Sequence, residues 1–592
     1  MRMLTTNLLI ITLVLILGFG VLFICCACIK KENFSNKMYL EPVYPENPPL
    51  PKTYGNMIIS GLPERNAITS QNSNGDCVVT GFRSCDNAKS TFTMMFNGDK
   101  LYDIKAKVRG HSSSTWEKFG MTLHLENKIS LDPIFRPSKK YILYAPYFEL
   151  ARILNPVTYF VSNQMGLKAP VMMPIQLWVD ENELAWPKTK TEWDKIAGSN
   201  ISKQIVKCSN GDTVTVQGGD SGYRGLYMLS SPVDDHLLGL VDGDFLVEWD
   251  RGDCPKDADT VLNTYTPWGS KDYVGSRPLM QFPDPNKDDN VMLGNILTDF
   301  VDRLFGPKPT SFRIPENQEP EDQSVLEMID FESWSKYFII SELAKSVDGW
   351  MFSTYMYVKV VNGKSKIYMG PPWDYNMAYS TCTSFDSCRD GGNVNAWIYA
   401  TQYLWWEPGK PKFQMPQIIA RLMCFKKWRQ YLFETYKGLR TSVLSNDNLY
   451  SVVDKFSELT KPVVEFDAQR WPNRLGWNYY PGDNEFFTKA VNMFKYWIKK
   501  RLAWMDENMK DGPAVDEFSG TNWKSLYSWS VCTFNSEGQC SNIKGGFPDG
   551  SYVKSSDGAE KPAFKQNNTG VFKAWWPYVR NDKEHPLDKP VW

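Results

Sequence analysis

The sequence is poor in histidine and in net charge, and it lacks the short motifs of several common catalytic folds. Only 4 of its 592 residues are His, and 66 basic side chains offset 67 acidic ones to give a net charge of −1. It contains no nucleophile elbow, no Walker-type Gly-rich loop and no His-x-x-x-His pair. Histidine-centred catalysis is therefore disfavoured. The absence of a basic tract also argues against a nucleic-acid partner.

Apolar and aromatic side chains, by contrast, are abundant. Hydrophobic residues make up 42% and aromatic residues 14% of the chain, a composition that disordered chains do not have. The length exceeds that of one ordinary core. We therefore expect one large two-lobed domain with an accessory piece.

The N-terminus carries the one long uncharged run. Residues 7–29 carry no charge and are mostly apolar, and a run of this length is enough to span a hydrocarbon core of roughly 30 Å. We interpret residues 1–29 as an uncleaved transmembrane anchor, since a cleaved signal peptide has a shorter apolar region and a small-residue cleavage site. Lys30 and Lys31 follow the run, so the positive-inside rule does not favour an external C-terminus.

The cysteines give the opposite indication about orientation. Three short pairs lie in Asp-, Ser-, Gly- and Asn-rich stretches: Cys77/Cys85, Cys382/Cys388 and Cys532/Cys540. They are typical of local disulfides in an oxidising compartment, and they lack the spacing and the nearby His of zinc sites. Glycosylation triplets at Asn33, Asn200 and Asn567 agree. Among the remaining cysteines, one must stay unpaired or pair between chains, and Cys424 is the candidate. We therefore expect the bulk of the chain to lie outside the cell or in the secretory lumen.

The order of patterns along the chain predicts an α+β fold. A Pro-rich stalk over residues 30–58 leads into a domain over residues 59–510, which is followed by a β-like or irregular appendage over residues 511–592. The domain begins with strand patterns and continues with helical ones. Strands are predicted over 59–130 and 170–250 with an insertion at 181–221, a strand and a helix over 140–165, and helices over 291–306, 331–347, 414–441 and 484–508.

Two aspartates flank a predicted hairpin. Asn362-Gly363 separates two strand-like runs, and Asn-Gly is the strongest short signal for a hairpin. This turn would place residue 351 opposite residue 374. Asp348 precedes the first strand and Asp374 follows the second, so both carboxylates would lie at the open end, with an offset of at most about 10 Å.

This placement suits phosphoryl transfer. One Asp can orient or deprotonate an attacking hydroxyl, while the other holds a metal ion that bridges nucleotide phosphates. Asn376 would add a neutral oxygen ligand. An Asp in such positions is also a common turn former, and that interpretation stays open.

Motifs in a fixed order produce a specific resemblance. SVDGWMFSTYMYVK and GKSKIYMGPPWDYNMAYS resemble the core signature of the CotH family of atypical secretory protein kinases. Arg109-Gly110-His111-Ser112-Ser113, GYRGLY at 222–227, DGDFLVEWDRGD at 242–253 and QRWP at 469–472 resemble further family motifs in the family's order. The resemblance spans roughly residues 55–505. It implies a two-lobed, protein-kinase-like fold that uses ATP with Mg²⁺ or Mn²⁺.

The resemblance also implies roles for individual residues. Asp348 matches the catalytic Asp and Asp374 the metal-binding Asp, with Asn376 and Ser353 as further metal ligands. Arg109, Lys118 and Glu149 would contact the nucleotide. A structural ion pair is an equal alternative for Arg109. The implied function is transfer of the γ-phosphoryl group of ATP to Ser or Thr of secreted or surface proteins by a membrane-anchored kinase.

Several positions depart from the family pattern. Ser353 stands where many kinases place a metal-binding Asn, Ser231 where many members have Glu, Glu117-Lys118-Phe119 where Pro-Lys-Lys is usual, and Ile153-Leu154-Asn155 where a Met-Arg-Asn-like triplet is usual. These departures support a second hypothesis. The chain would then be a surface adhesion or coat protein that keeps the fold without catalysis.

Overall fold

The computed structural model describes most of residues 48–509 and two short strands nearer the C-terminus. The chain divides into two compact units, Met1–Glu46 and Asn47–Trp592, and every described residue belongs to the second. Within 48–509 the positions not described are 64–65, 84–88, 98–99, 111, 148, 150, 180–200, 208–212, 221, 251–259, 268–276, 285–286, 307–321, 347, 362, 380–396, 400–414, 472, 475–476 and 479–483. The predicted anchor at residues 7–29 lies outside the described residues.

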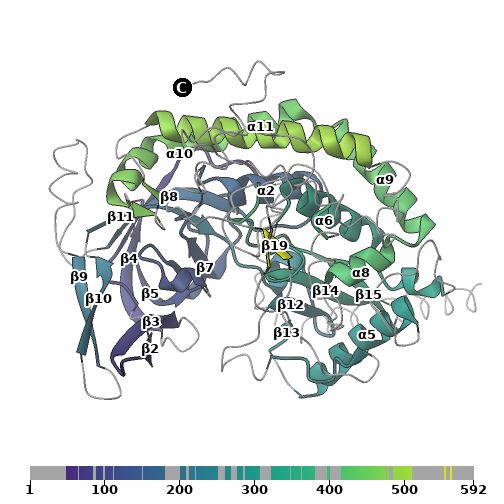
Figure 1. Ribbon diagram of the computed structural model, residues 1–592, viewed down its shortest axis with the longest axis horizontal. Coiled ribbons are helices and arrows are strands. Elements are labelled where there is room, and N and C mark those ends of the chain that lie inside the picture. The colour runs from purple at the N-terminus through teal and green to yellow at the C-terminus, as the bar shows by residue number, and fades with distance from the viewer. Residues whose placement is uncertain are drawn as a thin grey trace, which may run out of the picture. The chain divides into compact units, whose positions relative to one another are not determined.

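A closed seven-stranded β-barrel forms the first part of this unit (Figure 1). Its strands are, in spatial order, β1 (Gly55–Ile59), β4 (Ser90–Phe96), β5 (Lys100–Arg109), β6 (Gly120–Ile129), β7 (Ser138–Tyr144), β11 (Gly222–Ser230) and β8 (Met172–Val179). β1 pairs parallel with β8 and closes the barrel. Alternate side chains such as Met121, Leu123 and Leu125 point inward and are buried, which is the period-2 pattern of a half-buried strand.

Two predicted boundaries can be compared with the barrel. β1 begins at Gly55, so the barrel starts inside the stretch interpreted as stalk. β8 ends at Val179 and β11 begins at Gly222, and the two strands pair directly. The described strands of the stretch predicted as an insertion are therefore not part of the barrel. Its described part forms a separate two-stranded sheet of β9 (Ile201–Lys207) and β10 (Thr213–Asp220).

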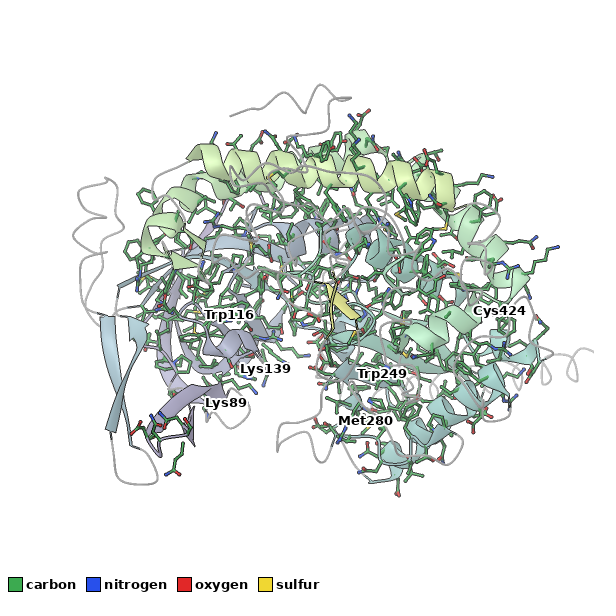
Figure 2. All side chains as sticks on the ribbon, viewed as in Figure 1. Lys89, Trp116, Lys139, Trp249, Met280 and Cys424 are labelled. Carbon is green, nitrogen blue, oxygen red and sulfur yellow. The ribbon has the colours of Figure 1, made fainter. Side chains whose placement is uncertain are left out.

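A four-stranded antiparallel sheet carries the predicted hairpin. Its order is β13 (Arg277–Phe282), β12 (Phe245–Asp250), β14 (Thr354–Val361) and β15 (Lys364–Met369). β14 and β15 pair from Val361↔Lys364 to Met356↔Met369, which confirms the hairpin and its register. On the neighbouring strands β12 and β13, where Figure 2 labels Trp249 and Met280, Val247 lies opposite Met280. Trp249 packs edge-on against Tyr265, with ring centroids 5.4 Å apart.

Helices dominate the second half of the described chain. They are α5 (Lys287–Phe305), α6 (Phe331–Ala344), α8 (Met415–Leu422), α9 (Lys426–Arg440), α10 (Asn446–Arg470) and α11 (Asn484–Asn508), preceded by α2 (Leu154–Gln164) and the short α4 (Asp235–Leu238). α6 begins where the Asp330 carboxylate accepts the Ser333 N–H at 2.8 Å, an N-cap bond. α6 packs against β15, α9 and α11, whereas α10 packs against α11 and barrel strand β11.

The α+β expectation is confirmed, although the short helix α4 and the long helix α10 were not predicted. α5, α6 and α11 lie where helices were predicted, and the single predicted helix at 414–441 is two helices, α8 and α9. α10 was not predicted, because Pro462 interrupts its pattern and Pro in a helix interior removes a hydrogen bond. Remaining short elements are η1 (Ser112–Thr115), η4 (Ser324–Glu327), β2 (Asn66–Gln71), β3 (Cys77–Arg83), β16 (Asn473–Arg474), β17 (Trp477–Asn478), β18 (Tyr552–Lys554) and β19 (Glu560–Pro562).

Two further sequence expectations concern cysteines and the membrane. Cys77 is disulfide-bonded, and Cys424 is a buried free thiol as predicted (Figure 2). Within the described ranges, none of the helices has the length and hydropathy needed to cross a bilayer.

Candidate functional site

Asp348 lies in a tight turn between α6 and β14. Its carbonyl accepts the backbone N–H groups of Met351 and Phe352 at 2.9 and 2.8 Å. Its side chain is half-buried. The turn therefore places a half-buried Asp immediately before the first strand of the hairpin.

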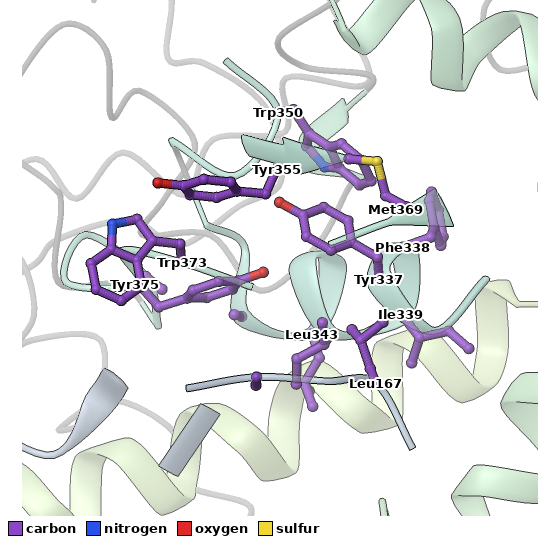
Figure 3. Packing of buried hydrophobic residues seen from close by; sticks show 14 of the residues in the cluster. Leu167, Tyr337, Phe338, Ile339, Leu343, Trp350, Tyr355, Met369, Trp373 and Tyr375 are labelled. Atoms are coloured by element: carbon purple, nitrogen blue, oxygen red, sulfur yellow. The ribbon is translucent and has the colours of Figure 1, made fainter. Parts of the chain in front are cut away.

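Helix α6 holds this turn through two side chains. The Tyr337 hydroxyl donates to the Gly349 carbonyl at 3.0 Å, and the Trp350 indole N–H donates to Glu342 Oε1 at 3.1 Å. Glu342 is fully buried and also accepts Arg501 Nη2 at 3.3 Å. Burial raises the pKa of Glu342, and Arg501 opposes that rise. Figure 3 shows Trp350, Tyr337 and Tyr355 packed together at this end of the hairpin.

Asp374 lies in the loop that follows β15, in an unusual backbone conformation. Its φ is 61°, in the left-handed region where a residue other than Gly costs about 1–3 kcal/mol unless the surroundings hold it. Its N–H donates to the Tyr159 hydroxyl of α2 at 3.0 Å. The next N–H, of Tyr375, donates to Asn155 Oδ1 at 2.7 Å. Long-range contacts therefore fix this loop.

The carboxyl group of Asp374 has a perturbed affinity for protons. Burial raises its pKa to about 6; Arg109 lowers it and Asp250 raises it further. Its side chain nonetheless retains some solvent exposure. A carboxylate that is desolvated and only partly compensated by a neighbouring cation is typical of functional sites.

Arg109 supplies that cation from the end of β5. Its guanidinium lies over the Trp373 ring, 5.0 Å from the ring centroid. Its Nη1 is buried, and no hydrogen-bond partner for it occurs among the described residues. The following residue, Gly110, has a φ of 100°, and a Cβ there would lie 2.1 Å from Ser113 Oγ. The Arg-Gly-x-Ser-Ser motif thus needs Gly to turn the chain sharply after Arg109.

The proposed metal ligands near Asp374 are oxygen donors. Asn376 is 9% exposed, and its Oδ1 is buried with no hydrogen-bond partner in the described part of the chain. Buried carbonyl oxygens are normally paired, so an orphaned one fits a cation ligand. Ser353 is half-buried with a φ of 52°, just before β14. Its position agrees with the predicted role but does not test it.

Together these donors fit Mg²⁺ or Mn²⁺. Among the described residues, no group of three or more His, Cys, Asp or Glu side chains could hold a metal ion. Mg²⁺ usually binds through one or two carboxylates, waters and substrate phosphates rather than in an all-protein cage. One carboxylate, one amide oxygen and one hydroxyl therefore suit it better than they suit a zinc site.

Two acidic residues on β12 also face this site and were missed. Tyr355 on β14 lies opposite Glu248, and burial, followed by Asp250, raises the pKa of Glu248 to about 8. Asp250 acts on Asp374 as well. Their signal in the sequence was two carboxylates at alternate positions of an otherwise apolar strand, FLVEWD.

Lys118 is placed differently from Arg109. It is fully buried, and its Nζ pairs with Asp467 Oδ1 on α10 at 2.6 Å. Arg152 Nε lies 3.0 Å from Asp467 Oδ2, and the N–H of Leu226 donates to Oδ1 at 2.9 Å. Gly225 passes so close that a Cβ would lie 2.3 Å from this carboxylate. Asp467 therefore joins three stretches of the sequence in a buried ion cluster.

Glu149 caps helix α2 from a fully buried position. It accepts the Leu154 N–H at 3.0 Å, Asn155 Nδ2 at 3.3 Å and the Tyr144 hydroxyl. Burial raises its pKa to about 7, and the hydrogen bonds from Tyr144 and Leu154 oppose that rise. Asp374 lies close enough to raise it further. Glu149 thus lies behind the site and is connected to the Asp374 loop through Asn155, which bonds both Glu149 and the Tyr375 N–H.

The structure brings most of the predicted residues to one end of the hairpin. Asp348 and Ser353 precede β14, Asp374 and Asn376 follow β15, and Arg109 lies over Trp373. Figure 3 shows Trp373 beside Tyr375 in this region.

Comparison with known proteins adds one assignment. No curated protein matches the chain. The segment that contains Asp348 and Asp374 does match a family model, whereas Arg109, Lys118 and Glu149 precede the matched residues. Residues 310–505 match the family described as CotH kinase protein, which confirms the resemblance and identifies this part of the chain as a CotH kinase family domain.

Proposed function

We propose that this protein is an ATP-dependent protein kinase that phosphorylates Ser or Thr hydroxyls of secreted or surface proteins. The family is described as a kinase family, which implies ATP and a divalent cation in general. The barrel and the helical part would form the two lobes. The observation that carries the proposal is the Asp374 loop, where a carboxylate with a raised pKa lies near the Arg109 cation and the Asn376 amide. Among the described residues, Arg109 Nη1 and Asn376 Oδ1 are buried and have no hydrogen-bond partner.

In this proposal Asp348 acts on the acceptor hydroxyl. The hydroxyl oxygen attacks the γ-phosphorus of ATP, the bond from that phosphorus to the bridging oxygen breaks, and ADP leaves. Asp348 orients the hydroxyl and accepts its proton, a role worth typically 10²–10⁴-fold in rate. Asp348 is half-buried rather than fully enclosed, as this role requires.

Asp374, Asn376 and Ser353 would hold the divalent cation. The cation would neutralise charge on the phosphates. Asp374 contributes the anionic ligand, and Asn376 contributes its orphaned carbonyl oxygen. Ser353 contributes a weaker hydroxyl ligand where many kinases use an amide.

Arg109 would pair with a phosphate oxygen. A guanidinium binds phosphate with directed, charge-assisted hydrogen bonds. Arg109 Nη1 has no hydrogen-bond partner in the described part of the protein. Lys118 would stabilise the site indirectly, since its buried ammonium pairs with Asp467. Glu149 would likewise act behind the site, through α2.

We further propose that the domain acts outside the cell or in the secretory lumen, anchored by residues 7–29. The disulfide at Cys77 supports an oxidising compartment. The substrate would then be another secreted or surface protein.

Labelled ATP tests the proposal directly. The full-length protein, expressed in an oxidising secretory host, is incubated with labelled ATP and Mg²⁺ or Mn²⁺ beside Asp348→Ala and Asp374→Ala. We expect label on the protein or on a Ser-rich acceptor, with a loss of at least about 100-fold in both variants. Unchanged transfer in Asp374→Ala would refute the assigned roles. A folded protein that transfers no label and shows no ATP-induced thermal shift would instead favour the adhesion or coat function.

A further inference from the structure

Helix α2 presents two hydrogen-bonding side chains to the backbone of the Asp374 loop. Asn155 and Tyr159 are four residues apart in α2, so they project from the same helix face. The Tyr159 hydroxyl accepts the Asp374 N–H at 3.0 Å, and Asn155 Oδ1 accepts the Tyr375 N–H at 2.7 Å. Two consecutive peptide groups of the loop are therefore bound by one helix more than 200 residues away in the sequence.

The same helix reaches the far end of the loop. Thr158 Oγ1 lies 2.8 Å from the Tyr379 hydroxyl, and both groups are buried. Asp374 and Tyr379 are both left-handed, with φ of 61° and 52°. Such conformations persist only where surrounding contacts over-determine them. The contacts from α2 lie at these two strained positions.

A second set of contacts fixes the orientation of Asn155. Its Nδ2 donates to Glu149 Oε1 at 3.3 Å, which leaves Oδ1 as the acceptor for the loop. The Tyr144 hydroxyl of β7 donates to the same Glu149 carboxylate. A chain of hydrogen bonds thus runs from the barrel through Glu149 and Asn155 to the peptide that follows Asp374.

We propose that Asn155 and Tyr159 are positioning residues that set the affinity of the Asp374 loop for its divalent cation. Neither is a ligand in this proposal. Each holds a loop peptide, so that the Asp374 carboxylate and the Asn376 carbonyl are presented together. The inference rests on the proposed role of Asp374 as the metal ligand, and it assigns to α2 a function that the CotH match at 310–505 does not cover.

Tyr159→Phe is the sharpest variant. It removes the acceptor oxygen but keeps the ring, which stacks on Trp373 with centroids 5.9 Å apart and planes inclined by 18°. Mn²⁺ binding to the full-length protein is measured by electron paramagnetic resonance without ATP. We expect binding to weaken by roughly three- to tenfold, the effect of losing one net hydrogen bond. Phosphoryl transfer should then recover at saturating Mn²⁺, with a raised Mn²⁺ requirement and a nearly unchanged kcat.

Two further variants separate positioning from general stability. Thr158→Val removes the contact to Tyr379 at nearly constant volume and should weaken Mn²⁺ binding in the same direction but less. Tyr141→Phe is the matched control, since its buried hydroxyl donates to the Ile129 carbonyl at 2.7 Å inside the barrel. It should lower the melting temperature about as much as Tyr159→Phe and leave Mn²⁺ binding unchanged.

The outcomes distinguish this inference from the proposed function. Equal Mn²⁺ affinity in wild type and Tyr159→Phe would overturn the positioning role. Mn²⁺ binding that is absent from the wild type, or that survives in Asp374→Asn, would overturn it as well. Weakened Mn²⁺ binding in Tyr159→Phe, in a protein that transfers no phosphate, would support the positioning role and remove only the kinase proposal.

Discussion

The two loops that carry Asp348 and Asp374 lie at the same end of one hairpin but are held in different ways. The Asp348 loop is held by α6, its neighbour in the sequence, through Tyr337 and Glu342. The Asp374 loop is held by α2, more than 200 residues earlier, through Asn155 and Tyr159. The first arrangement follows once the local helix–turn–strand unit forms. The second requires the barrel and the helical part to be assembled, so the proposed metal binding is the activity that would depend most on the whole domain.

The largest expected effect concerns the local side of this comparison. Glu342→Gln would leave Arg501 buried without its carboxylate, and breaking a buried pair costs about 3–5 kcal/mol. Urea unfolding measures this loss. The matched control is Glu434→Gln, whose exposed pair with Lys437 should contribute less than about 1 kcal/mol. Equal losses in the two variants would show that Glu342 does not anchor the Asp348 turn as argued.

A pH experiment tests the contacts that hold the Asp374 loop from α2, through Glu149. The pKa of Glu149 is about 7 in the folded protein against an ordinary value of 4.5. Between those values the folded state keeps a proton that the unfolded state has lost, so the free energy of unfolding should fall as pH rises, by at most about 1.4 kcal/mol per pH unit. Glu149→Gln should flatten this fall between pH 4.5 and 7. An unchanged slope would mean that Glu149 does not titrate in this window.

Two cations on the barrel side provide a further test of which contacts serve the site. Arg109→Gln should raise the KM for ATP by about tenfold or more, because a hydrogen bond from a charged group contributes about 1.5–3 kcal/mol, and the melting temperature should change little. Lys118→Met should lower the melting temperature, since it removes the ammonium that pairs with the buried Asp467 carboxylate. If instead only Lys118→Met raised the ATP KM, Lys118 would be the phosphate-binding residue and Arg109 the structural one.

The smallest expected effect concerns Gly110. Gly110→Ala places a Cβ 2.1 Å from Ser113 Oγ at a φ of 100°, a strain of about 1–3 kcal/mol that a rotation of the Ser113 side chain would partly relieve. Because the turn follows Arg109 directly, we expect a modest stability loss accompanied by a rise in the ATP KM. Thermal unfolding and initial-rate measurements report the two effects separately. A stability loss without any change in the ATP KM would show that the Gly110 turn does not determine where the Arg109 side chain lies.

Sequence reasoning succeeded where the structure is local. The Asn362-Gly363 pair predicted the hairpin, and the observed pairing from Val361↔Lys364 to Met356↔Met369 has the predicted register. It also predicted the free thiol of Cys424 and most helices. It missed α10, whose Pro462 hides the helical pattern, and it did not single out Glu248 or Asp250.

By itself, the sequence determined the hairpin and the two aspartates at its open end, because a two-residue turn fixes strand register without reference to the rest of the chain. Only the tertiary structure decided which distant groups meet them. Arg109 and Lys118 are cations that lie close together in the sequence, yet their surroundings differ. Lys118 is buried in an ion pair with Asp467, whereas Arg109 Nη1 has no hydrogen-bond partner among the described residues. The contacts of Asn155 and Tyr159 with the Asp374 loop depend in the same way on how α2 packs in the assembled domain, which no local pattern specifies.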